Sequence, residues 1–524
     1  MTGEDHATRS KGGSAHWIGG WVRYSYARLP GALWALILVA LPVTSFPLLA
    51  KLGGSPIVSP ASALPLAFIL LVWFGPYLYR RGTLPAELSP LVFFIVVAVF
   101  SSGVALYLDI APYKNQTPLE REIRALLTLL IGVAFYAIAT VFIRSRDEMV
   151  RTIKLINVGG AIVLIWALAQ GAIIYFYGGD YPGSMVTLHR WLSLRDPLTT
   201  RVTGLAYEPS WLANMLNLIY FPLWLGMLAS WRTVYSRKVW LVPIEFFLLL
   251  GGIVVIFLSQ SRIGLVGLLS MVGFLAVALA VRLAKAAYRA FWRASRSGPC
   301  RPGPVAQGIT YLAAFVLVVA MFLLLASTAV YTASQLDWRL GNLADGSVLE
   351  SIKDDVGYIF SYQFARALKF AERTAYWSAA LEVFNKNVFF GVGLGNSGFF
   401  FLEEIPGFGW SKPEVVQAIR PDSLGFPNPK NLWIRILAET GITGFTFVVV
   451  WLSLVLLRTW QLLTQRDPLY KTMGMIGVLA LIAVVVEGFS LDSCALPYMW
   501  ISLGLVSAAA RLSSSEVGLD PPSS

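Results

Sequence analysis

Few side chains in this sequence are placed to do chemistry, and the most informative is Arg262 in the stretch Ser259-Gln260-Ser261-Arg262. Long apolar runs flank this stretch on both sides, and the neighbours of the arginine are small and polar. A guanidinium group can hold an anion such as a phosphate with two parallel hydrogen bonds. The alternative is a membrane-interface anchor, with the stem of Arg262 in lipid and its head in water. We favour a functional role.

A second candidate is the carboxylate of Glu208, which lies in the run from Arg201 to Ala213. Pro209 suits the first turn of a helix, and an acidic residue just before it suits the positive end of the helix dipole. That structural role competes with a chemical one, in which Glu208 accepts a proton from a hydroxyl group at the membrane boundary. The sequence leaves both roles open.

Three further polar residues, Asn431, Arg435 and Glu439, follow one another at intervals of four, so they share one face of a helix. Asn431 can cap that helix, and Gly441 and Gly444 allow the chain to bend and pack closely after it. The charged face is either solvated on an amphipathic helix at the bilayer surface or directed into a site between an external segment and the bilayer.

Two other motifs favour structural roles. The Gly-x-Gly-x-Gly run at 391–395 lacks a preceding strand and a following Lys-Ser/Thr, so we interpret it as a tight turn rather than a phosphate loop. Glu487 and Asp492 lie near an apolar run, where we expect each to form an ion pair with an arginine. We find no metal-binding pattern, no cofactor motif and no Ser-His-acid set in the sequence.

The composition places all these residues in a membrane protein. Of the 524 residues, 56% are hydrophobic and 13% are charged, whereas a soluble domain is about 25% charged. The sequence contains twelve apolar runs, most of them near the roughly 20 residues that a span needs. They are 30–50, 61–79, 90–108, 125–143, 153–176, 209–229, 239–258, 263–281, 309–331, 442–457, 473–490 and 495–510. We expect an all-α polytopic membrane protein with about twelve transmembrane helices.

The distribution of positive charge orients these spans. Lysine and arginine gather in the N-terminal segment and after spans two, four, six, eight and ten, which places that side in the cytoplasm. The net charge of +12 therefore reflects the orientation of the spans in the membrane and does not indicate nucleic-acid binding. Cys300 and Cys494 fall on opposite sides of the membrane, so we expect no disulfide.

Three features then lie outside: the loop 178–208, the turn 259–262 and the long polar segment 331–444. Positive charge there contradicts the bias, and an anionic ligand is one local reason for it. The predicted organisation is a cytoplasmic tail (1–29), nine spans (30–331), a partly helical periplasmic segment (332–441), three spans (442–511) and a second cytoplasmic tail (512–524).

In their order and their common membrane side, four motifs resemble the O-antigen ligase and O-antigen polymerase (Wzy-type) superfamily of bacterial polysaccharide membrane proteins. The motifs are Arg201-Val-Thr-Gly-Leu-Ala-Tyr-Glu-Pro-Ser, the stretch 259–262, Arg373 to Trp377 leading into 391–396, and 431–444 with its Glu-x-Gly-x-x-Gly ending. The resemblance covers most of the chain. It implies a GT-C-like fold in the bacterial inner membrane, and metal-independent glycosyl transfer at the periplasmic face, without a cofactor, from an undecaprenyl diphosphate carrier to a sugar hydroxyl.

The resemblance also implies roles for individual residues. Its catalytic candidates are Glu208, Arg262 and Lys430, and its substrate-binding candidates are Arg201, Tyr207, Arg373, Asn431, Arg435 and Glu439. Ligases of the family carry histidine where this chain has Lys430, and a lysine with its usual pKa of about 10.4 is a poor general base. The Tyr-Glu-Pro-Ser motif is more reminiscent of the polymerases. We therefore favour a polymerase in which Glu208 handles the proton of the acceptor.

Besides a membrane-bound sensor or assembly scaffold, two alternatives remain. The first is a ligase of the same family, which transfers glycan to lipid A core. The second is a transporter of polysaccharide or lipid-linked sugars, although two related halves and short external loops, which are typical of transporters, are missing from the sequence. The expected partners are the undecaprenyl diphosphate-linked donor, the glycan acceptor and the bilayer, with a chain-length regulator and a flippase as further candidates and no nucleic acid.

Overall fold

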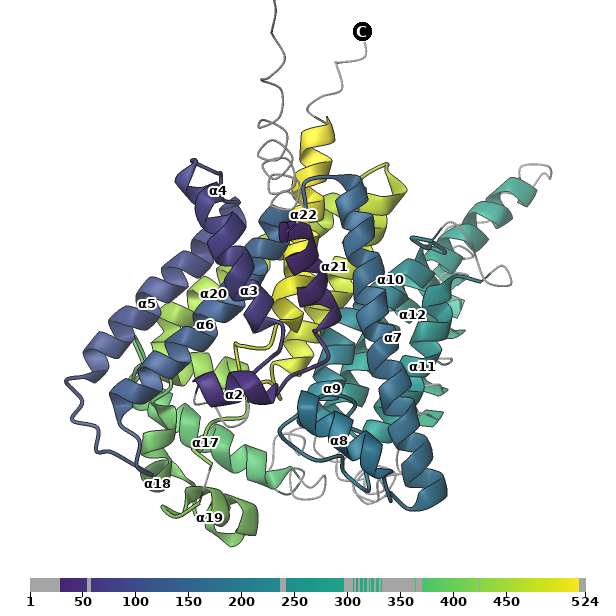
Figure 1. Cartoon of the computed structure of the whole chain (residues 1–524). Coiled ribbons are helices and arrows are strands. Elements are labelled where there is room, and N and C mark those ends of the chain that lie inside the picture. Colours follow the sequence, from purple (N-terminus) through teal and green to yellow (C-terminus); the bar gives the residue numbers. More distant parts are fainter. Residues whose placement is uncertain are drawn as a thin grey trace, which may run out of the picture.

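The computed structural model describes residues 29–53, 58–235, 242–295, 370–423 and 425–517, together with scattered positions between 305 and 363. These residues form helices joined by turns and loops, with isolated β-bridges at Ser45–Ser59 and Tyr113–Gln116. Long helices lie side by side, and shorter helices gather at one end of the bundle (Figure 1).

Seven helices among the described residues are long and apolar enough to cross a membrane. They are α5 (Ser89–Ala105) with the 3-10 turn before it, α6 (Pro118–Phe142), α7 (Arg146–Tyr177), the composite α9 to α10 (Pro209–Ala229), α12 (Arg262–Ser295), α20 (Leu432–Thr464) and α21 (Pro468–Glu487). Shorter helices that also coincide with predicted spans are Leu29–Val39, α3 to α4 (Ala63–Tyr79), α11 (Ile244–Ser259) and α22 (Tyr498–Val517). The chain is therefore an all-α polytopic membrane protein, as the sequence predicts.

Four predicted segments lie partly or largely outside the described residues. The ninth predicted span, 309–331, and the external stretch 332–369 lie largely outside them, as do the N-terminal tail and the residues after 517. At the other end of the chain, α22 continues to Val517, which extends the last helix into the predicted C-terminal tail 512–524.

The first predicted span, 30–50, is wrong in its second half. The helix Leu29–Val39 ends before Pro42, because proline lacks an N–H group and clashes with the preceding helical turn. The chain then turns, and the N–H of Phe46 donates to the carbonyl of Ser59 at 2.8 Å. The short helix α2 (Pro47–Gly53) follows and packs against α8 (Gly183–Leu192) at the lower end of Figure 1.

The helices of the external segment build a small core of their own. They are α17 (Ala371–Lys386), α18 (Phe401–Glu404) and α19 (Pro413–Ile419). Their buried apolar side chains, including Tyr376 and Phe401, cluster together with Ala438 of α20. From residue 370 onward, the described part of the external segment is thus a folded unit seated on the first turns of α20.

A bend at Gly441 joins this unit to the membrane bundle. Gly441 has φ 66° within α20, so the carbonyls of residues 438 and 439 lose their partners at 442 and 443. Residues 388–393 pair with all four groups: Val392 N–H with the Ala438 carbonyl at 3.0 Å, Gly393 N–H with Glu439 at 3.0 Å, Ile442 N–H with Val388 at 2.8 Å and Thr443 N–H with Phe389 at 3.3 Å. The loop therefore replaces the hydrogen bonds that the bend breaks.

The glycine run 391–395 makes this close pairing possible. Gly391, Gly393 and Gly395 have φ values of 67°, 89° and 88°, a conformation that side chains rarely adopt. A Cβ atom on Gly391 would also lie 2.5 Å from the carbonyl oxygen of Ala438. The predicted tight turn is confirmed, and its glycines are required by backbone packing.

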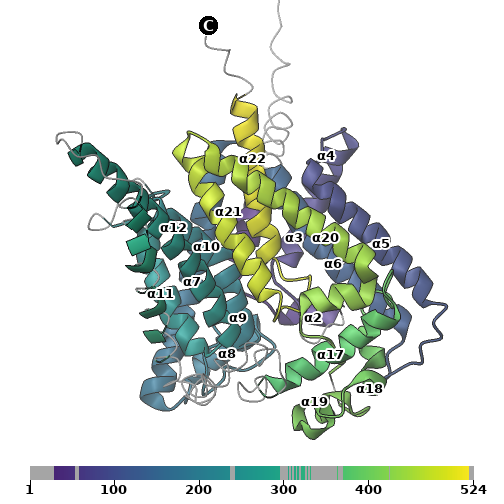
Figure 2. The ribbon, with the colours of Figure 1, turned by 180° about the vertical axis from the view of Figure 1, so that it is seen from behind.

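The predicted external features gather at one end of the bundle. In both views α2, α8, α17, α18 and α19 lie at the lower end, whereas α4 and the connection between α20 and α21 lie at the opposite end (Figures 1 and 2). The described segments that the sequence places outside thus share one end, and two of the basic loops lie at the other end.

Candidate functional site

Arg201 is fixed against the turn that carries Arg262. Its Nε and Nη2 atoms donate to the carbonyl of Ser259 at 3.1 and 3.0 Å, and Nη2 also donates to the carbonyl of Gln260 at 3.1 Å. These carbonyls end α11, where they have no partner further along the helix. Two of the predicted cations are thus brought to one place although they are distant in sequence.

The turn itself is held by its own side chains. The Ser259 hydroxyl donates to the carbonyl of Ile256 at 2.7 Å and accepts from the N–H of Ser261 at 3.3 Å. The Ser261 hydroxyl in turn accepts from the N–H of Gly264 at 3.4 Å, in the first turn of α12. Both serines are buried. Arg262 therefore starts from a backbone whose position is fixed by the ends of two helices.

Glu208 lies immediately before α9 (Pro209–Met215) and is half-buried. Pro209 occupies the first turn of the helix, as the structural interpretation predicts. The Glu208 carboxylate accepts a hydrogen bond from the hydroxyl of Ser210 at 3.2 Å. It is also an electrostatic neighbour of Arg373 on α17, which connects it to the external segment. Both roles of Glu208 remain compatible with this position.

Arg373 is the centre of a charged cluster at the start of α17. Burial lowers the pKa of its guanidinium, and the nearby carboxylates of Asp492, Glu208, Glu487 and Glu372 oppose this shift. These groups come from different parts of the chain, so the first turn of α17 connects the external segment, the start of α9 and the end of α21.

The fully buried carboxylate of Glu487 is held mainly by amides. Asn217 donates to its Oε1 atom, and the amide of Asn214, oriented to donate, reaches its Oε2 atom. Asn217 lies in the π-helical turn Leu216–Tyr220 between α9 and α10 (Phe221–Ala229). We expected an ion pair with an outer arginine, but Arg373 is an electrostatic neighbour and the direct contacts are amides.

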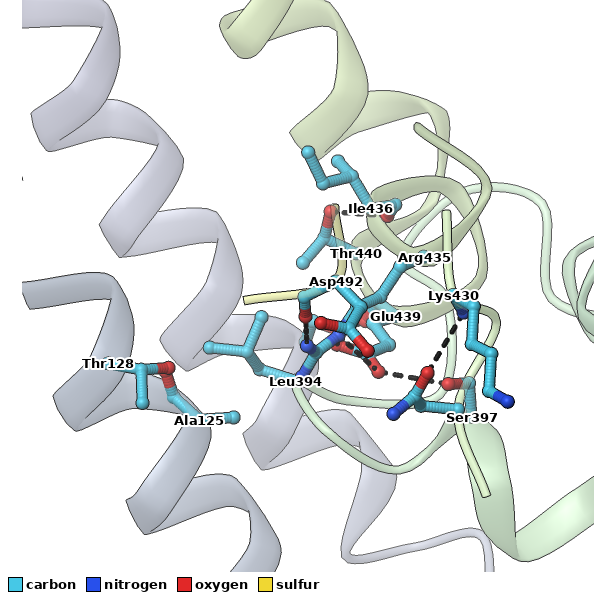
Figure 3. A network of polar contacts seen from close by, with 12 residues as sticks. Ala125, Thr128, Leu394, Ser397, Lys430, Arg435, Ile436, Glu439, Thr440 and Asp492 are labelled. Carbon is cyan, nitrogen blue, oxygen red and sulfur yellow. Dashed lines mark hydrogen bonds and ion pairs between the residues drawn. The ribbon is translucent and has the colours of Figure 1, made fainter. Parts of the chain in front are cut away.

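Arg435 and Glu439 share one face of α20, as predicted, and Figure 3 shows the network around them, whereas Asn431 precedes the first turn of the helix. Asn431 Oδ1 accepts from the N–H groups of Trp433 and Ile434 at 3.0 and 3.2 Å, which confirms the predicted cap. Arg435 Nε lies 3.1 Å from both carboxylate oxygens of Glu439.

This charged face is covered, so the interpretation as a solvated surface is wrong. Glu439 is 2% exposed, and its Oε1 atom accepts from the hydroxyl of Ser397 in the external segment at 2.9 Å. Arg435 also donates to the backbone carbonyl of Asp492. The pair therefore holds the external segment and the residues after α21 against α20.

Lys430 stands apart from that pair. Its backbone is left-handed, with φ 50°, and its N–H donates to the side chain of Asn428 at 2.9 Å. The ammonium group lies 5.0 Å from the ring centroid of Tyr376. Glu372 is an electrostatic neighbour. The side chain of Lys430 is thus held against α17.

Tyr207 contributes to the outer loop rather than to the cluster around Arg373. Its N–H donates to the hydroxyl of Thr44 at 2.9 Å. Its ring lies 5.7 Å from that of Trp211, and the guanidinium of Arg195 is 5.6 Å from its centroid. Arg195, which the sequence places on the external side, thus lies over the ring of Tyr207, a predicted substrate-binding residue.

Sequence reasoning missed several members of the site. Asn214 and Asn217 are ordinary polar residues in an apolar run, and only their spacing of three on one helical face hinted at a shared partner. Glu372 and Glu414 are 42 positions apart and have no pattern that joins them. Ser397 was likewise hidden, because its partner Glu439 lies on another element.

One comparison with known proteins identifies a family. Residues 246–449 match the O-antigen ligase family, a range that contains Arg262, Arg373, Lys430 and the start of α20. The region of Arg201, Tyr207 and Glu208 lies before the matched range. A search of curated proteins gave no significant match. Over residues 246–449, the chain is therefore similar to the O-antigen ligase family.

Proposed function

We propose that this protein polymerises undecaprenyl diphosphate-linked oligosaccharide repeats at the periplasmic face of the bacterial inner membrane. The observation that supports this most is the fixing of Arg201 on the turn of Arg262, at the end of the bundle where the external segment lies. A lipid-linked diphosphate would present its negative charge at that end, next to the bilayer. Cations placed there suit a substrate of this kind.

The reaction needs a cation and a base. The oxygen of an acceptor hydroxyl attacks the anomeric carbon of the donor, and the bond from that carbon to the diphosphate breaks. The carrier diphosphate leaves as an anion, which arginine can stabilise without a metal when its charge is already in position. We assign this role to Arg262, with Arg201 and Arg373 as neighbouring binders of the diphosphate.

The proton of the acceptor hydroxyl goes to a base, and we assign that role to Glu208. Its carboxylate is half-buried and near Arg373, so it can lie close to a diphosphate bound there. In this account Lys430 binds substrate as a cation. The other three residues of this motif have structural roles. Asn431 caps α20, and the ion pair of Arg435 and Glu439, together with Ser397, holds the external segment against α20.

A ligase that uses lipid A core as acceptor is the second candidate, and the description of the matched family favours it. A strain that lacks this gene distinguishes the candidates by its surface glycan. Loss of a polymerase leaves single repeats attached, and loss of a ligase leaves none. Accumulation of repeats on the inner leaflet would instead point to a transporter and would overturn the proposal.

A further inference from the structure

A cavity of about 590 Å³ lies in the external segment beside α19. Its polar lining side chains are Glu414, Gln417, Arg420, Asp422 and Ser423. They offer both hydrogen-bond donors and acceptors, which is what a saccharide with many hydroxyl groups needs. None of these residues belongs to the diphosphate site described above.

The wall of the cavity is fixed by a different element. The ammonium group of Lys114, between α5 and α6, donates to the carbonyls of Ala418 and Gly425 and to the hydroxyl of Ser423. The hydroxyl of the adjacent Tyr113 donates to the carbonyl of Ile419. These bonds tie the chain after α19 to the membrane bundle, so the cavity has a set shape before any ligand binds.

Glu414 connects the cavity to the functional site. Its carboxyl group is an electrostatic neighbour of Glu372 on α17, the residue before Arg373 in sequence. Lys430 and Lys412 are the cationic neighbours of Glu372, and the hydroxyl of Tyr376 lies near both carboxyl groups. Burial and the nearby Glu414 raise the pKa of Glu372, so its carboxyl group can donate a hydrogen bond to a sugar hydroxyl when protonated and accept one when ionised.

One buried polar atom near the pair has no partner among the described residues. Tyr376 is 1% exposed, and its hydroxyl makes no hydrogen bond in this part of the chain. Its ring is already stacked with that of Phe401 and covered by Lys430. An unpaired buried hydroxyl costs free energy, and its neighbours here are the two carboxyl groups.

We propose that the cavity beside α19 binds the acceptor saccharide, and that the Glu372–Glu414 pair at its edge binds a hydroxyl group of that saccharide. The identification of this saccharide as the acceptor rests on the proposed function. Saccharide binding by the cavity does not depend on it. The cavity then brings the acceptor to the side of α17 that carries Lys430, while Arg373 faces the donor.

The test is direct binding of a saccharide without any donor. The probe is the oligosaccharide repeat released from its lipid carrier by mild acid, added to the full-length protein in detergent and followed by saturation-transfer NMR. We expect Glu414→Gln and Asp422→Asn to weaken binding at least fivefold, as expected when hydrogen bonds to charged groups are lost. Glu382→Gln is the matched control, since Glu382 is exposed on α17 and outside the cavity.

Because Glu414 and Asp422 are both exposed, their substitution leaves the buried core untouched, and unchanged thermal unfolding verifies this. Equal binding by wild type, Glu414→Gln and Asp422→Asn would overturn the proposal, as would a wild type that binds no saccharide. Failure of the proposed function has a different signature: wild type would bind the saccharide through Glu414 and yet make no polymer from lipid-linked repeats.

Discussion

Replacement of Arg201 by lysine tests how the turn at 259–262 is held. The guanidinium makes three hydrogen bonds to the carbonyls of Ser259 and Gln260, and a single ammonium group at that distance can replace about one of them. Hydrogen bonds from charged groups contribute about 1.5–3 kcal/mol each, and the lower figure suits a partly exposed arginine. Loss of two bonds then costs about 3 kcal/mol.

That cost translates into a rate. If the turn holds Arg262 in place for the transition state, about 3 kcal/mol corresponds to a fall of roughly 100-fold in turnover. The assay is polymer formation by purified Arg201→Lys protein from lipid-linked repeats, with kcat and KM measured separately. Arg190→Lys is the control, because Arg190 is an exposed residue of the same external loop that pairs with Asp196 at 2.7 Å. A kcat for Arg201→Lys within twofold of wild type would refute the reasoning.

Three further predictions concern other parts of the site. Glu208→Gln should lower turnover by roughly 100- to 10,000-fold with donor binding retained, and near-normal polymer in the same assay would reduce Glu208 to a residue that starts a helix. Gly441→Ala should lower the thermal unfolding midpoint, since the new Cβ would lie 2.2 Å from a backbone carbonyl of the external segment at a φ of 66°. Gly31→Ala is its control, with nothing within 4 Å, and equal midpoints would contradict the account of the bend. Burial and the neighbouring Glu414 raise the pKa of Glu372, so its protonated form persists to higher pH than usual. The KM for the acceptor should therefore rise as the pH increases through this pKa, and a pH profile unchanged by Glu414→Gln would argue against an effect of Glu414 on the pKa of Glu372.

The sequence predicts those parts of the fold that depend on nearby residues. Runs of apolar residues locate the helices, and the polar residues Asn431, Arg435 and Glu439 recur at helical spacing, so the cap and the shared face follow. The break at Pro42 also has a local signal, since proline stops a helix, but run length and hydropathy alone extend the span past it.

Contacts between distant segments could not be predicted in the same way. Periodicity shows that Arg435 and Glu439 share a face, but it does not show that Ser397 and the glycine run cover that face. The pairing of residues 388–393 with the bend at Gly441 is also a property of two backbones, which no side-chain pattern records. The same holds for Arg201, whose partners are carbonyl groups rather than side chains.

The most direct test of the central claim is elongation by the purified protein acting on undecaprenyl diphosphate-linked repeats, with wild type compared with Arg262→Lys. The account predicts that wild type forms polymer, and that Arg262→Lys loses most activity although its charge is kept, because an ammonium group cannot reproduce the planar fork of arginine. It also predicts unchanged amounts of protein in the membrane. Absence of polymer from wild type, or full activity of Arg262→Lys, would contradict the account.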